Sequence, residues 1–169
     1  VYPLFAQALR KEEKKTAATH LSECSTLFSE FSKIASKNPY SWFPSYRSAS
    51  EIAEETSNNR MVGFPYTKYL NSVIRVNMAS AFILMSQSKA DELNVAENKR
   101  VYVHGCSILN DIWNVTERPD FHSSPAIKTC VNQSLDQAEI SFSDIKHFDL
   151  YSCFPSAVQI AKKELGIPE

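Results

Sequence analysis

The stretch that decides the fold is FDLYSCFPSAVQIAKKELG, residues 148–166. It opens on Phe148 and Leu150, residue types that buried strands prefer. Pro155 suits the first position of a helix, where its missing N–H costs nothing. Apolar residues then recur at helical spacing, and Gly166 supplies a left-handed helix end. We therefore predict a strand, a tight turn and a helix, and such a turn is where α/β proteins place their sites.

Composition limits the classes of protein to which the chain can belong. In 169 residues, 43% are hydrophobic, which is enough for a real core, and the formal net charge of −1 gives no reason to expect nucleic acid or an anionic membrane. The four cysteines are scattered and form no metal-binding pair. Free thiols favour a reducing compartment, so we predict the cytoplasm. Because the chain begins at Val1 without a Met and stops after a helix end, we expect a segment of a longer polypeptide.

Two regions follow one another along the chain. Residues 1–72 predict two helices and then an irregular part rich in aromatic residues and proline, with a capping box at Ser48 and Glu51. The second predicted helix has a wide apolar stripe, formed by Leu21, Cys24, Phe28, Phe31 and Ala35 with Leu27 and Ile34 beside it. Residues 73–169 alternate predicted strands, over 73–86, 101–105 and 148–152, with helices. This order predicts an α/β fold with a doubly wound pattern.

Three motifs in order carry a resemblance to a known family. They are NRMVGFPY (residues 59–66), HSSPAI (122–127) and DLYSCFPSAVQ (149–159). The chain resembles the thiolase superfamily, in its acetyl-CoA acetyltransferase branch, which is related to the sterol-carrier-protein type of thiolase. The resemblance implies a partial thiolase-like domain, with the loop domain over residues 1–72 and the first part of the C-terminal half over residues 73–169. It also implies an incomplete mixed sheet, in which 101–105 and 148–152 can pair and the strand near 80–85 lacks its usual neighbour.

The resemblance also implies site residues. Tyr151 stands where the family has an Asn that anchors a water in the oxyanion site, and its hydroxyl can either hold that water or serve as the tip of a core aromatic. Cys153 is either a buried small residue or a nucleophile. Arg60 and Lys68 lie in the loop region that covers coenzyme A, so they are either phosphate contacts or solvated surface charges. No metal site is expected.

The function implied is that of an acyltransferase acting on acyl-CoA thioesters, with coenzyme A as part of the substrate. The family needs a nucleophilic Cys, activated by a His, and a second Cys that moves a proton. Their sequence contexts are missing from this chain, and none of its four histidines is predicted by spacing to pair with a cysteine. We therefore expect the isolated chain to be inactive. Because the incomplete sheet leaves apolar surface uncovered, we also expect a homo-oligomer, with a rearranged compact monomer as the alternative. The alternative is a non-catalytic module that binds acyl-CoA or a partner on a thiolase scaffold.

Overall fold

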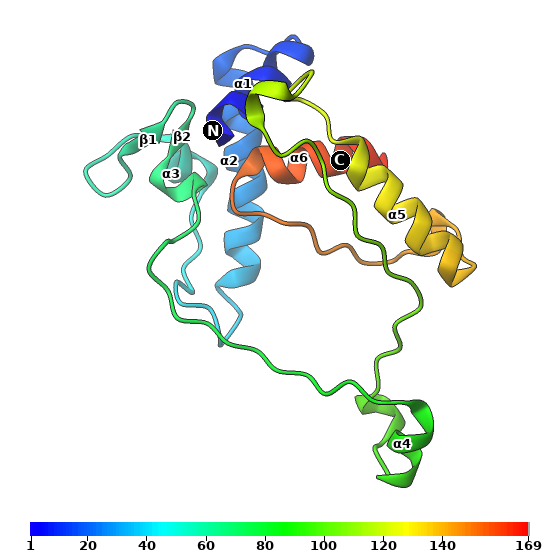
Figure 1. Cartoon of the computed structure of the whole chain (residues 1–169). Coiled ribbons are helices and arrows are strands. Elements are labelled where there is room, and N and C mark those ends of the chain that lie inside the picture. The colour runs from blue at the N-terminus through cyan, green and yellow to red at the C-terminus, as the bar shows by residue number, and fades with distance from the viewer. Residues whose placement is uncertain (169) are drawn as a thin grey trace.

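Helices dominate the computed structural model, which describes residues 1–168 (Figure 1). The α-helices are α1 (Tyr2–Glu12), α2 (Ala17–Ala35), α3 (Ala49–Ala53), α4 (Gln87–Glu92), α5 (Pro125–Ala138) and α6 (Pro155–Leu165). The strands are β1 (Met61–Gly63) and β2 (Tyr66–Thr67), and the 3-10 helices are η1 (Lys68–Leu70), η2 (Glu97–Lys99), η3 (Val115–Glu117) and η4 (Phe142–Asp144). None of the helices within residues 1–168 has the length and apolar composition that crossing a membrane requires.

The helix beginnings follow the local sequence. At the start of α2, Thr16 Oγ1 accepts a hydrogen bond from the backbone N–H of Thr19 at 3.1 Å. Ser48 and Glu51 form the predicted capping box of α3, and Ser86 caps α4. These side chains satisfy N–H groups that the first helical turn leaves without partners. The predictions of these helix starts are confirmed.

The end of α6 also follows the prediction. Pro155 stands in its first turn, and Gly166 ends it with φ 65°, the left-handed conformation that glycine adopts without strain. Helix α5 begins at Pro125, as predicted, and Glu139, which directly follows its last residue Ala138, has φ 55°. A residue with a side chain therefore occupies the position at the end of α5 where a glycine would be relaxed.

The buried face of α2 differs from the predicted stripe. Phe31 and Ile34 are exposed, whereas Cys24 is fully buried. The buried residues of α2 are His20, Cys24, Ser25 and Ser29. Helix α2 packs against α3, η1 and α6, and small side chains on that face let the elements approach. The size of the side chains at these contacts determines which face of α2 is buried. The spacing of apolar residues along the sequence carries no information about that size.

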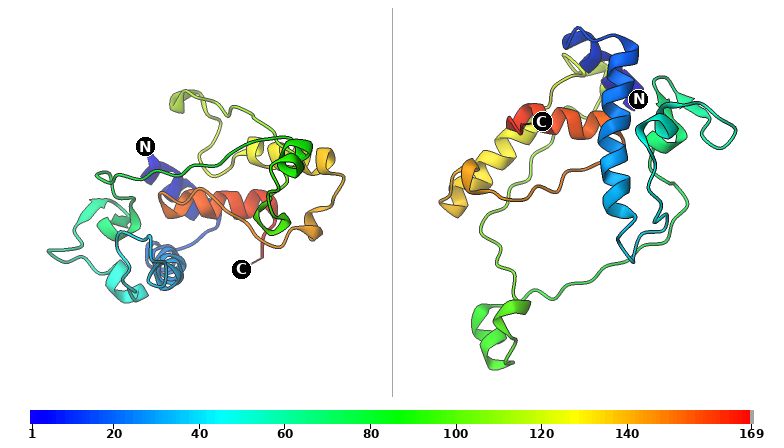
Figure 2. Two further views of the ribbon diagram at one scale, coloured as in Figure 1. Left: turned by 90° about the horizontal axis from the view of Figure 1, so that it is seen from below. Right: turned by 180° about the vertical axis from the view of Figure 1, so that it is seen from behind.

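The core draws on distant parts of the chain. Its buried cluster consists of Ala6, Cys24, Ile52, Tyr66 and Leu70, with Tyr2, Leu21, Phe28, Tyr69 and Phe154 packed around it. Phe154 comes from the turn before α6, so residues 1–72 and the C-terminal helix share one core. Figure 2 shows α6 lying across α2. The division predicted at residue 72 stays a prediction.

The predicted strands run as extended chain without a sheet. Within residues 1–168 the one sheet is the antiparallel pair β1–β2. The turn between the strands lies at residues 64–65, directly after Gly63, where a turn was predicted. Residues 73–86, 101–105 and 148–152 form no strand, and the expected pairing of 101–105 with 148–152 is absent from the described backbone hydrogen bonds. A strand is held by hydrogen bonds to a neighbouring strand, which these segments do not have. These three segments run between the helices as extended chain (Figure 1).

Candidate functional site

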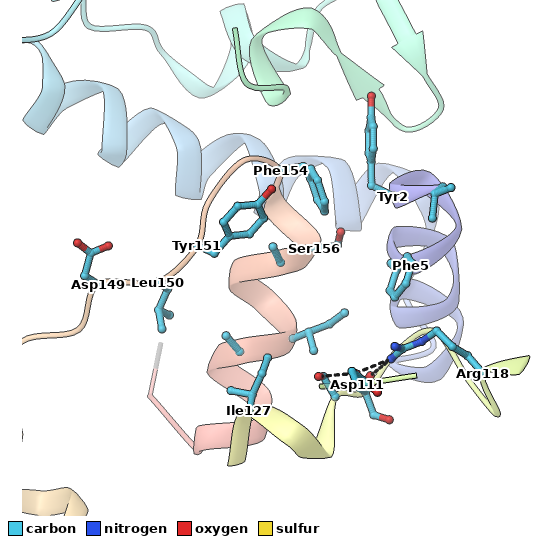
Figure 3. Close-up of a pocket in the computed structure, with 16 residues that line it drawn as sticks. Tyr2, Phe5, Asp111, Arg118, Ile127, Asp149, Leu150, Tyr151, Phe154 and Ser156 are labelled. Carbon is cyan, nitrogen blue, oxygen red and sulfur yellow. Dashed lines mark hydrogen bonds and ion pairs between the residues drawn. The ribbon is translucent and has the colours of Figure 1, made fainter. Parts of the chain in front are cut away.

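The turn before α6 is built on a stack of aromatic rings. Phe154 stacks on Tyr2 with ring centroids 4.7 Å apart, and Tyr2 in turn stacks on Tyr66 at 5.9 Å. Tyr151 meets Phe154 edge-on at 6.1 Å, as seen in Figure 3. Stacked and edge-to-face pairs of this kind add to the free energy of burial. The stack therefore fixes the turn against α1 and the β1–β2 hairpin.

Two hydrogen bonds also hold the turn. The backbone N–H of Ser156, in the first turn of α6, donates to the hydroxyl of Tyr66 at 3.1 Å. The backbone N–H of Ser72 donates to the carbonyl of Cys153 at 3.0 Å. Burial raises the pKa of Tyr66, so its phenol stays protonated. The position of α6 is thus set by residues that lie some 90 positions earlier in the chain.

A cavity of about 490 Å³ opens beside this turn, in the size range of small-molecule sites. Figure 3 shows its walls, which come from α1, the 111–124 loop, α5, residues 149–151 and α6. The apolar wall consists of Phe5, Ile127, Leu150, Phe154, Ala157, Ile160 and Ala161. Its composition suits a ligand part that carries little polar surface.

The polar end of the cavity is occupied by charges that neutralise each other. Arg118 Nη2 lies 3.0 Å from Asp111 Oδ2 and also donates to the carbonyl of Ser123. The hydroxyl of Ser124 donates to the same carboxylate at 2.7 Å. Burial would raise the pKa of Asp111, but the hydrogen bonds from Ser124 and Arg118 outweigh it and lower that pKa. Since Arg118 is paired with Asp111, and the acidic residue Asp149 also lines the cavity, the cavity favours an uncharged group over an anion.

The comparisons with known proteins agree with the fold. No protein-family model matches the sequence, and no curated protein matches it. Among solved structures, the chain is similar to a crystal structure of a monomeric SCP2-thiolase like protein type 1 from Mycobacterium smegmatis. The two are 34% identical and superpose with a TM-score of 0.85 over 99% of this chain and 36% of that chain. The chain belongs to the thiolase superfamily.

This membership confirms both the recognised family and the fold class, a partial thiolase-like α/β fold. The chain spans 36% of the length of the solved relative. The helices follow the relative's fold although the sheet of residues 73–169 is not formed within the described chain.

The structure places Tyr151 at the rim of the cavity. The residue is 67% exposed, so it is not a core aromatic, and its hydroxyl lies beside the Cys153 side chain. The neighbouring Cys153 side chain, with some burial, raises the pKa of Tyr151, which keeps the phenol protonated. Cys153 is half-buried. The role of Tyr151 in an oxyanion site stays a prediction.

Arg60 and Lys68 lie together but away from this cavity. The backbone N–H of Lys68 donates to the carbonyl of Arg60 at 2.9 Å, which places the two residues side by side at the hairpin. Both side chains are exposed, and Arg60 Nη1 donates to the carbonyl of Met61. Neither residue lines the cavity beside Tyr151. Their contact with coenzyme A stays a prediction.

Sequence reasoning missed one Cys–His contact. Cys24 Sγ lies 3.7 Å from His20 Nε2, four residues earlier on α2. Helical spacing of four places side chains on one face, so this contact could have been found. Burial raises the pKa of the Cys24 thiol to about 12 and lowers the pKa of His20. The pair is therefore a buried neutral contact, since a nucleophilic cysteine needs the thiolate.

The cavity residues of the 111–124 loop were also missed. The sequence shows only a polar loop there, yet Asp111 and Arg118 pair across it. The available signal was Asp120 followed by Ser123, a spacing typical of turns that a carboxylate stabilises. In the structure Asp120 Oδ1 accepts from the backbone N–H groups of His122 and Ser123 at 3.0 and 2.9 Å. His122 lies 3.7 Å from Glu12 Oε2, so it belongs to this loop's attachment to α1.

Proposed function

We propose that the chain is part of a thiolase-like acetyl-CoA acetyltransferase and contributes binding surface for an acyl-CoA thioester. The proposal rests above all on the superposition, at 34% identity, with an SCP2-thiolase like protein. Its catalytic Cys and His are supplied from outside these residues, so the isolated chain is inactive. The four free thiols are consistent with a cytoplasmic location.

The cavity beside Tyr151 supports this choice of ligand. A short acyl group is apolar, which matches the apolar wall, and its thioester carbonyl is polar but uncharged, which matches the paired charges of Asp111 and Arg118. The hydroxyl of Tyr151 at the rim can hold a water near the developing oxyanion. Coenzyme A phosphates would lie outside the cavity, where Arg60 and Lys68 provide two exposed cations beside each other.

Binding of butyryl-CoA, measured by isothermal titration calorimetry, tests the proposal. Ala157 is half-buried in the cavity wall on α6. We expect Ala157→Phe to fill the cavity and weaken binding at least about tenfold, since steric exclusion costs more than one buried contact. Lys163→Phe places the same side chain on an exposed position of α6 and should leave binding unchanged. Equal binding by both variants, or no binding by the unmodified chain, would contradict the proposal.

The alternative is an acyl-CoA-binding module that has lost catalysis. It shares the binding surface of the first proposal and differs from it in the parts outside these residues; the buried Cys24–His20 contact, with the raised pKa of the Cys24 thiol, is structural in both. The relative is described as monomeric, whereas we propose a homo-oligomer for this chain because of its exposed apolar segments. Light scattering at micromolar concentration decides the oligomeric state.

A further inference from the structure

A histidine is buried at the contact between α2 and α6 without a full set of hydrogen-bond partners. His20 lies near the start of α2 and is fully buried. Its Nε2 lies 3.7 Å from Cys24 Sγ, and the thiol of Cys24 donates to Gln159 Oε1 of α6 at 3.7 Å. The other ring nitrogen, Nδ1, has no hydrogen-bond partner within residues 1–168. His20, Cys24 and Gln159 therefore join the two helices through polar side chains, and we call them the His20 cluster.

The His20 cluster suits a neutral imidazole and not a charged one. Because the thiol of Cys24 donates its proton to Gln159, the sulfur can accept from Nε2–H, and Nδ1 then carries the lone pair. A second proton would go to Nδ1, where the described residues provide no acceptor. A buried charge without a partner costs more free energy than a buried lone pair. Burial accordingly lowers the pKa of His20 from its ordinary value of 6.5.

The charges around the His20 cluster do not compensate a proton on the ring. The ionisable groups that face the cluster come from α1, the turn after it, α2 and β2, and they are Arg10, Glu13, Lys15, Glu23 and Tyr66. The two glutamates favour a charged ring, but Lys15 Nζ lies 2.9 Å from Glu13 Oε2 and 2.6 Å from Glu23 Oε2. Lys15 and Arg10 oppose the charge, and α6 contacts the cluster through the uncharged amide of Gln159. Both carboxylates are thus already paired with Lys15.

Helix α6 connects the His20 cluster to the cavity. It contacts Cys24 through Gln159, and with Ala157, Ile160 and Ala161 it forms one wall of the cavity (Figure 3). If α6 separates from α2, water reaches the ring of His20 and solvates a charge there.

We propose that His20 makes the α2–α6 contact sensitive to protons: when its ring takes up a second proton, the contact opens and α6, with the cavity wall that it carries, separates from α2. The open form binds this proton with the ordinary histidine pKa of 6.5, whereas burial lowers the pKa of the closed form. The contact therefore has its full stability above pH 6.5 and loses it as the pH falls below that value.

Labelling of the Cys24 thiol measures the opening. Dithiodipyridine reacts with thiols at acid and at neutral pH, and mass spectrometry separates the labelled cysteines. Cys24 is buried and Cys106 is exposed, so the ratio of their labelling rates reports the opening and cancels most of the pH dependence of the reagent. We expect this ratio to rise about tenfold from about pH 7.5 to about pH 5.5, because one proton is taken up below pH 6.5. An unchanged ratio in the unmodified chain would overturn the proposal, whether or not any variant folds.

Two variants assign the effect to His20. His20→Gln removes the titrating ring, so its labelling ratio should be the same at both pH values. His147→Gln is the matched control, because His147 is exposed, and this variant should keep the rise. A rise that survives His20→Gln, or one that His147→Gln abolishes, would overturn the proposal. Far-UV circular dichroism of the unmodified chain should change little over this interval, and a loss of the helical signal would overturn the proposal in favour of global acid unfolding.

Discussion

At the scale of single residues, the hydroxyl of Tyr66 is the contact that joins the hairpin to α6. It accepts from the buried backbone N–H of Ser156 at 3.1 Å. We expect Tyr66→Phe to lower the free energy of unfolding by about 1–3 kcal/mol, because a buried N–H loses its partner. Urea denaturation measures the change. Tyr40→Phe removes an exposed hydroxyl and should have no effect, so a similar loss in both variants would contradict the role of Tyr66.

The carboxylate of Asp111 makes stability depend on pH. Its pKa is lowered from the ordinary value of 3.8, with burial opposing and hydrogen bonds from Ser124 and Arg118 outweighing it. A lowered pKa in the folded state contributes stability above pH 3.8, and this contribution is lost as the pH falls through the lower folded value. We expect Asp111→Asn to flatten the loss of stability below that pH.

Acid unfolding curves provide the control for this prediction. Asp136 is an exposed residue of α5 whose carboxylate has no hydrogen bond or ion pair in the described part of the chain. Asp136→Asn should therefore keep the slope of the unmodified chain. If Asp111→Asn keeps that slope as well, the Arg118–Asp111 pair does not contribute to the pH dependence.

The predicted cations at the hairpin give a binding prediction. We expect the double variant Arg60→Ala with Lys68→Ala to weaken coenzyme A binding roughly tenfold, since ionic contacts of solvent-exposed cations contribute up to about 1 kcal/mol each. Calorimetry with the unmodified chain as reference measures it. Lys33→Ala removes an exposed cation from the far part of α2 and should leave the affinity unchanged. Equal affinities for all three proteins would exclude the hairpin cations as contacts.

At the scale of elements, what the sequence could predict depends on how local the interaction is. Caps at Thr16, Ser48 and Ser86 lie within three residues of the N–H groups they bind, so their residue types suffice. Whether residues 101–105 form a strand could not be predicted in this way, because a strand depends on a partner that lies far away in the chain. The prediction of the buried face of α2 was wrong for the same reason, because the contacts of α2 with α3 and α6 determine which side chains fit there.

At the two left-handed helix ends we expect substitutions to change the stability in opposite directions. Gly166 and Glu139 have φ values of 65° and 55°. We expect Gly166→Ala to destabilise the chain by about 1–2 kcal/mol, because a Cβ is strained in this conformation. Glu139→Gly should instead stabilise it by up to about 1 kcal/mol by relieving that strain. Thermal unfolding measures both, and a shift of the same sign in the two variants would contradict the account.

At the scale of the whole molecule, the candidate site could be located but not assembled from the sequence. The motif around Tyr151 pointed to the turn before α6, and the cavity does lie there. Its other walls come from α1 and from the 111–124 loop. Phe5 and Arg118, which meet with the guanidinium 5.3 Å from the ring centroid, are more than 100 positions apart in the chain. Spacing within a motif carries no information about such contacts.

The same distribution of residues determines what the isolated chain can do. Covalent thioester chemistry needs a thiolate and a base that activates it. Cys24 has His20 beside it, but burial raises its thiol pKa to about 12. We therefore expect no measurable cleavage of acetoacetyl-CoA by the purified chain. The assay measures the decrease in absorbance of the acetoacetyl-CoA enolate. Cleavage that Cys153→Ala abolishes would overturn this prediction and make Cys153 the nucleophile. Cleavage that survives Cys153→Ala but not Cys24→Ala would instead require an opening of the α2–α6 contact, where Cys24 lies 3.7 Å from Gln159.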